Sequence, residues 1–127
     1  MSKVLILLLI GLVVCAQASR QSTSVKGSIT CRGKAVGGLK VKLIDEAGGK
    51  EIGRSLTDDH GFYSVAGSTS HTFRTIKPVV QIRYNCGNWF EQCYKFKIPK
   101  DHITKGDVPK KTFDASRVEL SSVKHNC

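Results

Sequence analysis

Apolar and polar residues alternate in short runs along most of the chain, and Gly, Asp or Pro residues separate the runs. The alternation has a period of two residues within 25–31, 39–43, 80–84 and 94–98. Successive side chains of a β-strand point to opposite faces, so this period predicts strands with one buried face. Similar runs predict further strands at 52–57, 62–66 and 111–120.

Seven short strands joined by tight turns predict an all-β fold, a sandwich of two sheets. No stretch has the 3.6-residue period of an amphipathic helix, although residues 99–105 are compatible with one helical turn. The polar segment 20–24 and the C-terminal segment 123–127 are expected to fray, unless the final cysteine is bonded. The pattern therefore predicts one domain over residues 19–127.

The first 18 residues have the pattern of a secretory signal peptide. Lys3 precedes an unbroken apolar run over 4–14, and Ala16-Gln17-Ala18 has the small-x-small form that signal peptidase accepts. The run is shorter than the roughly 20 residues that cross a bilayer. We therefore expect a secreted, extracellular protein that loses Cys15 and keeps four cysteines in an oxidising compartment.

The chain is strongly basic, with a formal net charge of +10 at pH 7. A basic surface attracts anionic partners such as phospholipid head groups, sulfated glycans, acidic proteins or nucleic acid. Solubility alone would explain the charge equally well. Nucleic acid is not expected, because the sequence contains no nucleic-acid-binding motif and secretion would remove the usual partners.

The sequence gives little support for catalysis. It lacks the Gly-x-Ser-x-Gly, His-Glu-x-x-His and Gly-x-x-x-x-Gly-Lys motifs. Residues 58–61, Asp-Asp-His-Gly, lack the alternating oxygen ligands of a calcium loop and predict a hairpin turn instead. The spacing of Cys86 and Cys93 is not that of a zinc knuckle. We therefore expect a protein that is not an enzyme and holds neither a metal nor a cofactor.

Two segments together resemble a known fold. Residues 33–43 place a Gly-rich turn before an alternating strand, and residues 57–63, Thr-Asp-Asp-His-Gly-Phe-Tyr, place a Gly turn before an aromatic pair. In this order they resemble the prealbumin-like sandwich. With Tyr84-Asn85-Cys86, a cysteine opening the run 94–98, Phe113-Asp114 and a terminal cysteine, the chain is similar to the nematode transthyretin-like family over 24–127.

This resemblance implies an extracellular role, in which a family member bridges anionic phospholipid on a cell surface to a receptor. Distant relatives with the same fold include the thyroid-hormone carrier transthyretin and the hydrolase of 5-hydroxyisourate. The hydrolase ends in Tyr-Arg-Gly-Ser, whereas this chain ends in Lys124-His125-Asn126-Cys127. The hydrolase activity is therefore not expected here.

The four remaining cysteines, Cys31, Cys86, Cys93 and Cys127, allow three disulfide pairings. Cys86 and Cys93 flank one predicted loop between neighbouring strands, so we favour a local Cys86–Cys93 bridge. Cys31–Cys127 would then join the first strand to the C-terminal segment. The two crossed pairings stay open.

The chain's one tryptophan, Trp89, lies beside Phe90 in the same predicted loop, with Arg83, Lys95 and Lys97 nearby in the sequence. Aromatic anchors beside cations predict a site that docks on an anionic phospholipid or an extracellular protein receptor. The competing explanation, slightly favoured, is that Trp89 folds back over a sheet edge. The alternative function is that of a carrier for a small apolar ligand, such as a lipid or a hormone-like molecule.

Overall fold

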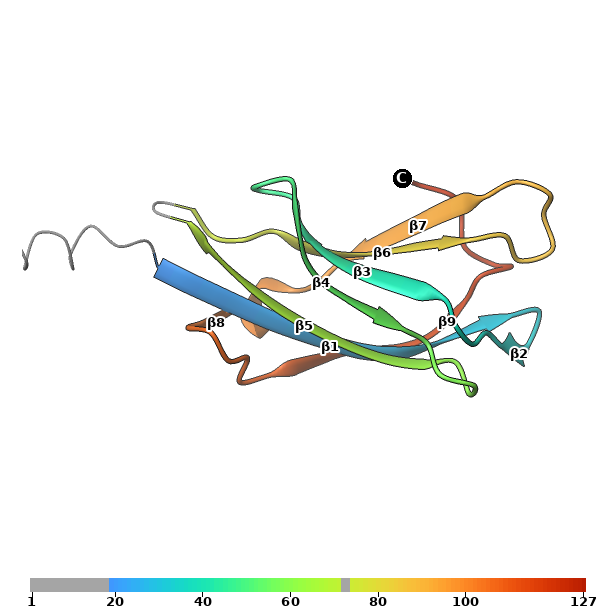
Figure 1. Ribbon diagram of the computed structural model, residues 1–127, viewed down its shortest axis with the longest axis horizontal. Coiled ribbons are helices and arrows are strands. Elements are labelled where there is room, and N and C mark those ends of the chain that lie inside the picture. Colours follow the sequence, from blue (N-terminus) through green and yellow to red (C-terminus); the bar gives the residue numbers. More distant parts are fainter. Residues whose placement is uncertain (1–18, 72–73) are drawn as a thin grey trace, which may run out of the picture.

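The computed structural model describes residues 19–71 and 74–127, which form two β-sheets packed face to face (Figure 1). This arrangement confirms the predicted all-β sandwich. The predicted signal peptide, residues 1–18, lies outside the described residues and stays a prediction. The strands are β1 (Ser19–Cys31), β2 (Lys34–Ala35), β3 (Lys40–Asp45), β4 (Lys50–Leu56), β5 (Phe62–His71), β6 (Pro78–Tyr84), β7 (Gln92–Lys97), β8 (Thr104–Lys105) and β9 (Thr112–Glu119).

The first sheet is organised around β1 and the second around β3 and β6. β1 pairs with β5 along one side, with β8 and β9 along the other, and with β2 at its C-terminal end. β9 runs parallel to β1, and the other pairs are antiparallel. The second sheet is antiparallel throughout, in the order β4-β3-β6-β7. Seven longer strands match the expected number, and β2 and β8 are two-residue additions.

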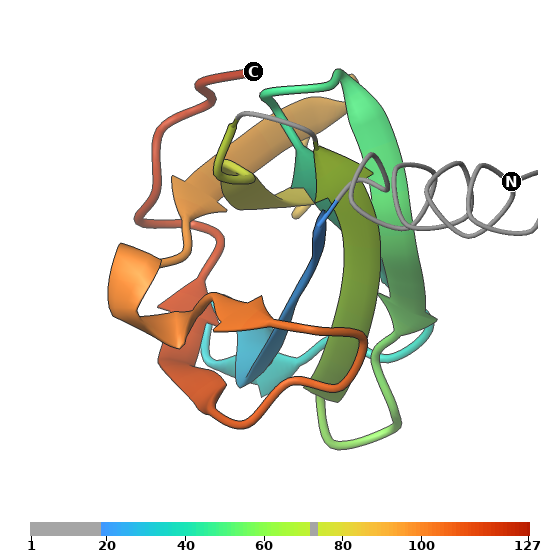
Figure 2. The same cartoon turned by 90° about the vertical axis from the view of Figure 1, so that its left-hand side faces the viewer.

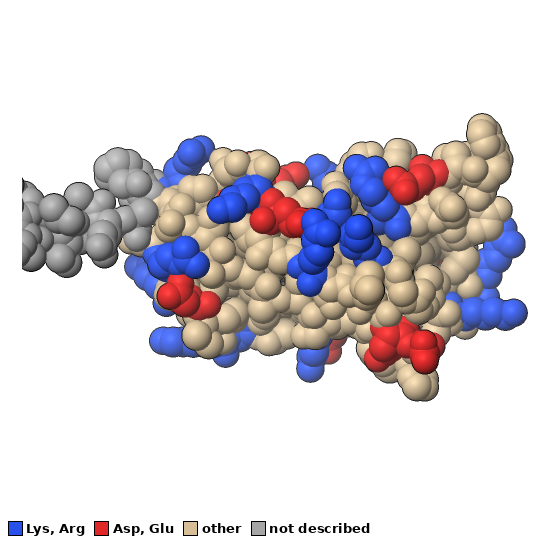
Figure 3. Space-filling model, viewed as in Figure 1, with Lys and Arg blue, Asp and Glu red and all other residues tan. Residues whose placement is uncertain are grey.

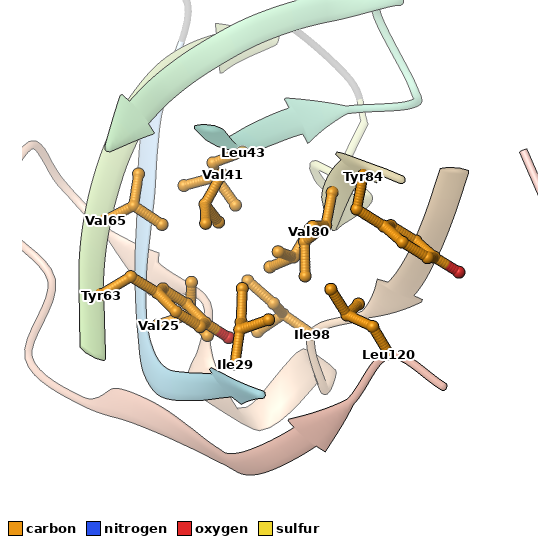
Figure 4. Close-up of a cluster of buried hydrophobic side chains, with 11 residues drawn as sticks. Val25, Ile29, Val41, Leu43, Tyr63, Val65, Val80, Tyr84, Ile98 and Leu120 are labelled. Carbon is orange, nitrogen blue, oxygen red and sulfur yellow. The ribbon is translucent and has the colours of Figure 1, made fainter. Parts of the chain in front are cut away.

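The inward-facing apolar positions of both sheets meet in one core (Figure 4). The side chains that the alternation placed on a single face of 39–43 and 80–84 lie there, almost completely buried except for Leu39, which is partly buried. The fully or nearly fully buried members of this core are Val25, Ile29, Val41, Leu43, Tyr63, Val65, Val80, Ile82, Tyr84, Ile98 and Leu120. The two-residue period therefore predicted correctly which faces are buried.

The sheets approach most closely where β4 lies beside β5, and two glycines permit the approach. A Cβ on Gly67 would collide with the carbonyl oxygen of Ile52, and one on Gly53 would lie 2.5 Å from the carbonyl oxygen of Ala66. Real Cβ atoms do not tolerate such contacts with backbone, so only glycine fits without a shift of the strands.

Residues 20–24, which were expected to fray unless the final cysteine is bonded, form the first half of β1 and pair with β5, and the final cysteine is bonded. The side chains of 21–24 are buried, and those of Gln21, Thr23 and Ser24 find partners on distant segments, whereas the Ser22 hydroxyl has none among the described residues. The Gln21 amide donates to the Arg74 carbonyl at 2.8 Å, and the Thr23 hydroxyl donates to the His102 carbonyl at 3.0 Å. Buried polar groups with such partners are tolerated in an interior.

The segment between β7 and β8 contains the helical turn that the sequence allowed, a 3-10 helix η1 (Lys100–His102). It is the only helix in the described part of the chain, and it is far too short to cross a membrane.

The C-terminal segment covers the outer edge of β7. The Cys93 N–H donates to His125 Nδ1 at 2.7 Å, and the Asn126 N–H donates to the Cys93 carbonyl at 2.9 Å. The Asn126 side chain both accepts from and donates to the Lys95 backbone, at 2.8 and 3.0 Å. Open strand edges recruit other chains, so this cover protects the sheet from edge-to-edge pairing. The segment 123–127 was expected to fray unless Cys127 is bonded. Cys127 forms a disulfide with Cys93, so the segment is held in place.

Candidate binding site at the Cys31–Cys86 end

The four cysteines of the described residues are all disulfide-bonded, but the favoured pairing is wrong. The bonds are Cys31–Cys86, with the Cα atoms 5.7 Å apart, and Cys93–Cys127, with the Cα atoms 5.3 Å apart. The first bond joins the end of β1, in one sheet, to the segment after β6, in the other. The second joins β7 to the C-terminal segment.

Cys86 does not pair with Cys93 because the two side chains lie on opposite faces of the second sheet. Cys86 packs against the core between the sheets, where it meets Cys31. Tyr94 and Phe96 of β7 also face this core, so the strand alternation puts Cys93 on the outer face. The sequence separation of two cysteines says nothing about which face each one occupies.

The Cys31–Cys86 bond brings two tight turns together at one end of the molecule, to the right in Figure 1. Arg32 and Gly33 have φ values of 52° and 79° and close the β1–β2 hairpin, in which Cys31 pairs with Lys34. Cys86 and Gly87, at 40° and 81°, form a similar turn closed by the Asn88 N–H on the Asn85 carbonyl at 2.9 Å. Two consecutive residues with positive φ define a type I′ turn.

The two turns touch each other. The Arg32 guanidinium lies against the backbone of Gly87, so close that a Cβ there would be 2.7 Å from its Nη2 atom. Glycine at position 87 therefore serves two needs, a positive φ and space for the arginine.

Glu119, at the end of β9, holds the Arg32–Gly33 turn in place. Its carboxylate accepts the backbone N–H groups of Arg32 and Gly33, at 2.9 and 2.7 Å, and the hydroxyl of Ser121 at 2.6 Å. These hydrogen bonds hold the pKa of Glu119 well below its usual range. The Ser121 hydroxyl has the largest effect, followed by the N–H groups of Gly33, Ser121 and Arg32, and together they outweigh desolvation, which raises the pKa. The carboxylate is therefore charged at neutral pH and buttresses the turn.

Trp89 and Phe90 project from the loop that follows the second turn. Trp89 is 93% exposed and Phe90 45% exposed, and their rings meet edge to face with centroids 5.3 Å apart. The explanation that Trp89 covers a sheet edge is therefore wrong. An exposed aromatic pair on a loop anchored by a disulfide is a feature that the core does not require.

Arg83 is the one predicted cation that lies close to this loop. It pairs with Glu91 at 3.3 Å and lines a small groove of about 190 Å³ on the outer face of the second sheet, together with Lys40 and Lys42. In Figure 3 these basic side chains contribute to the blue area over β3.

Lys95 and Lys97 do not belong to the loop. Lys95 is ion-paired with Glu46 at 3.0 Å. Lys97 is five residues beyond the start of β7, about 16 Å along the strand, and lines a different groove. The structure thus brings together Trp89, Phe90 and Arg83 and leaves the two lysines elsewhere.

Arg32 and Lys34 are the cations that sequence reasoning missed. Both are exposed and in none of the ion pairs found among the described residues. They lie more than 50 positions from Trp89 in the sequence, and only the Cys31–Cys86 bond places them at the same end. The turn at Gly33 could be predicted from the sequence, but its contact with the turn at Gly87 could not.

Within residues 19–71 and 74–127 no group of three or more His, Cys, Asp or Glu side chains is placed to hold a metal ion. The chemistry of this end is that of two exposed aromatic rings bordered by cationic side chains. Such a surface can bind a partner that is both apolar and anionic.

Comparisons with known proteins identify the family. The model of the Transthyretin-like family matches residues 26–99. The chain is 29% identical to Transthyretin-like protein 2 of Caenorhabditis elegans, over 80% of this chain and 76% of that protein. It is 31% identical to Transthyretin-like protein 33 of the same organism, over 91% and 90%. A solved 9R-lipoxygenase from Cyanothece matches with a TM-score of 0.43 and 14% identity, over 77% of this chain and 16% of the lipoxygenase, which bears on neither fold nor activity. The chain therefore belongs to the transthyretin-like family.

Proposed function

We propose that this protein acts outside the cell as a binding protein that docks its Cys31–Cys86 end on an anionic phospholipid surface. The observation that carries the proposal is the 93% exposure of Trp89 beside Phe90, on a loop held by a disulfide. A large aromatic side chain is stable at the boundary between head groups and acyl chains, where its apolar ring is buried and its N–H stays hydrated.

The surrounding cations supply the preference for anionic lipid. The Arg32 guanidinium lies against Gly87 at the base of the loop, and Lys34 belongs to the same hairpin as Arg32. Neither side chain is in an ion pair among the described residues, whereas Arg83 is partly neutralised by Glu91. Each basic residue close to an anionic membrane contributes about 1 kcal/mol of attraction, which is screened by salt. The aromatic pair and the two unpaired cations together favour an anionic bilayer over a neutral one.

Co-sedimentation with vesicles tests the proposal, using phosphatidylcholine alone and phosphatidylcholine with phosphatidylserine. We expect binding only to the anionic vesicles, and a loss of about tenfold or more in affinity for Trp89→Ala and for Arg32→Glu with Lys34→Glu. Val108→Ala is the matched apolar control, because Val108 is 76% exposed but lies outside this end. Lys50→Glu with Lys110→Glu is the matched charge control.

Two results would contradict docking on phospholipid. One is equal binding to neutral and anionic vesicles, and the other is an unchanged affinity of Trp89→Ala. Binding to a protein receptor without any binding to vesicles would assign the same end to the receptor instead.

Transport of a small apolar ligand is the alternative function. Native mass spectrometry of protein purified from its source would show a retained ligand if the alternative holds. A groove of about 780 Å³ beside the exposed Leu56 and Phe62 also carries Lys26, Asp58, Asp114 and Arg117. The grooves at Lys97 and at Arg83 are charged as well, so a purely apolar ligand has less support than an anionic surface.

A further inference from the structure

A second basic surface lies at the opposite end of the long axis, where η1, β8 and the segment before β6 meet (Figure 2). We call it the basic strip and define it by five cations: Arg74, Lys77, Lys97, Lys100 and Lys105. They come from two stretches of the sequence, 74–77 and 97–105, which the fold brings together.

The strip follows three grooves that share residues. The groove lined by Lys77, Lys97 and Lys100 has a volume of about 390 Å³. Lys100 also lines a groove of about 450 Å³ with Arg74 and Lys77, and one of about 470 Å³ with Arg74 and Lys105. The shared residues make the grooves one continuous, extended depression rather than three isolated pockets.

The five cations of the strip are in none of the ion pairs formed by the described residues. The acidic groups around them are already bonded to other partners: Glu46 to Lys95, Asp107 to Arg20, and Asp101 to His102. Asp45, below the strip, is bonded to His71. The strip therefore keeps its positive charge available to a ligand.

Buried polar side chains fix the backbone that carries the strip. The Gln21 amide accepts the Ile76 N–H at 2.9 Å and donates to the Arg74 carbonyl at 2.8 Å, so it clamps the segment between Arg74 and Lys77. Asp45 accepts the Lys77 N–H at 2.9 Å. Several cations held on a fixed backbone lose less conformational freedom on binding than cations on a flexible tail.

The strip does not have the features of a membrane-docking surface. The apolar residues beneath it, Ile76, Val79 and Ile98, are at most 4% exposed and cannot insert into a bilayer. An extended line of cations in a depression fits a chain of regularly repeated anionic groups, each of which can accept a charge-assisted hydrogen bond.

We infer that the basic strip binds a sulfated polysaccharide. The site is separate from the proposed phospholipid site and does not depend on it, because the two surfaces occupy opposite ends of the molecule. A protein with both sites could be retained on a sulfated glycan matrix while its aromatic end stays free.

Binding of a heparin octasaccharide, measured by isothermal titration calorimetry at several salt concentrations, tests the inference. We expect Lys77→Glu with Lys100→Glu to weaken binding about tenfold or more and to flatten its salt dependence, since fewer ions are displaced. Lys77→Gln with Lys100→Gln should show a smaller loss in the same direction. The control is Arg32→Glu with Lys34→Glu, which changes the net charge equally at the opposite end of the molecule and should keep most of the affinity.

An equal loss in the control would mean that heparin responds only to net charge, and this would overturn the inference. So would a loss of heparin binding in Trp89→Ala, because it would place the glycan at the other end. Vesicle binding of the strip variants separates the two proposals: if heparin binding is lost and vesicle binding kept, the strip is a glycan site whether or not Trp89 docks on lipid. Far-ultraviolet circular dichroism confirms that each variant is folded before it is compared.

Discussion

Asp45 is the charged residue among the fully buried side chains of the described structure. Its side chain is completely buried at the end of β3, where one oxygen accepts the N–H groups of Lys77 and Ala47 and the other meets His71 Nε2 at 2.5 Å. Burial by itself would raise the pKa of this carboxyl. The hydrogen bonds from Lys77, His71 and Ala47, with the charge of His71, outweigh burial and lower the pKa.

Replacement of Asp45 by Asn should destabilise the fold by about 1–3 kcal/mol at pH 7, because a buried charge-assisted network loses its acceptor charge. A carboxyl whose pKa is lowered by folding stabilises the protein above its unfolded pKa, near 3.8, and this contribution is lost as the pH falls through the folded value. The difference in unfolding free energy between wild type and Asp45→Asn should therefore shrink below about pH 4.

Urea denaturation at pH 7, 5 and 3 measures this difference, with Asp59→Asn at an exposed position as the control. A difference that stays constant from pH 7 to pH 3 would contradict the account of Asp45. An effect of Asp59→Asn as large as that of Asp45→Asn would do the same.

The strands whose two faces differ most in burial could be predicted from the sequence. β3 and β6 alternate over 40–43 and 80–84 because one face packs in the sandwich and the other carries Lys, Arg or Gln. β7 is less clear, because its outward-facing Cys93 is buried as well. The first half of β1 could not be predicted in this way, since Gln21 to Ser24 are all buried and all polar. The hydrogen-bond partners of Gln21, Thr23 and Ser24 come from distant segments, which no local sequence pattern indicates.

The candidate site was predictable only in part for a related reason. The exposed aromatic pair could be identified as unusual from its composition and position. Its cationic neighbours depend on the disulfide connectivity, which depends in turn on the face that each cysteine occupies. Arg32 and Lys34 therefore replace Lys95 and Lys97 once the Cys31–Cys86 bond is known.

The Cys31–Cys86 bond should both stabilise the fold and support docking of this end on vesicles. Loss of either disulfide should lower the free energy of unfolding by as much as about 4 kcal/mol, because each closes a loop of 34 or 55 residues in the unfolded chain. Cys31→Ser with Cys86→Ser should also weaken vesicle binding, since it releases the Arg32 turn from the Trp89 loop. Cys93→Ser with Cys127→Ser is the matched control and should keep more of the vesicle binding.

Urea denaturation and vesicle co-sedimentation of the two double variants measure these effects. Each is compared at a temperature where both are folded. If the Cys93 and Cys127 variant lost vesicle binding at least as strongly as the Cys31 and Cys86 variant, the role of the Cys31–Cys86 bond in docking would be refuted.

At the scale of the whole molecule, the two packed sheets separate two different surfaces. One end presents exposed aromatic rings with Arg32 and Lys34, and the other presents cations in a depression without exposed aromatic residues among those that line it. The chain has a net charge of +10, and its basic side chains differ from surface to surface in whether they are ion-paired. Ion pairs neutralise part of it on the outer face of the second sheet, at Lys42, Arg54, Arg83 and Lys95.

The central claim is that the Cys31–Cys86 end inserts Trp89 into an anionic bilayer, and the fluorescence of this single tryptophan tests it most directly. In buffer, Trp89 should emit as a solvated indole and be quenched freely by acrylamide. With phosphatidylserine-containing vesicles, its emission should shift to shorter wavelength, acrylamide quenching should fall by about twofold or more, and brominated phospholipids should quench it. An emission maximum and a quenching constant that do not change, while the protein co-sediments with the same vesicles, would contradict the claim.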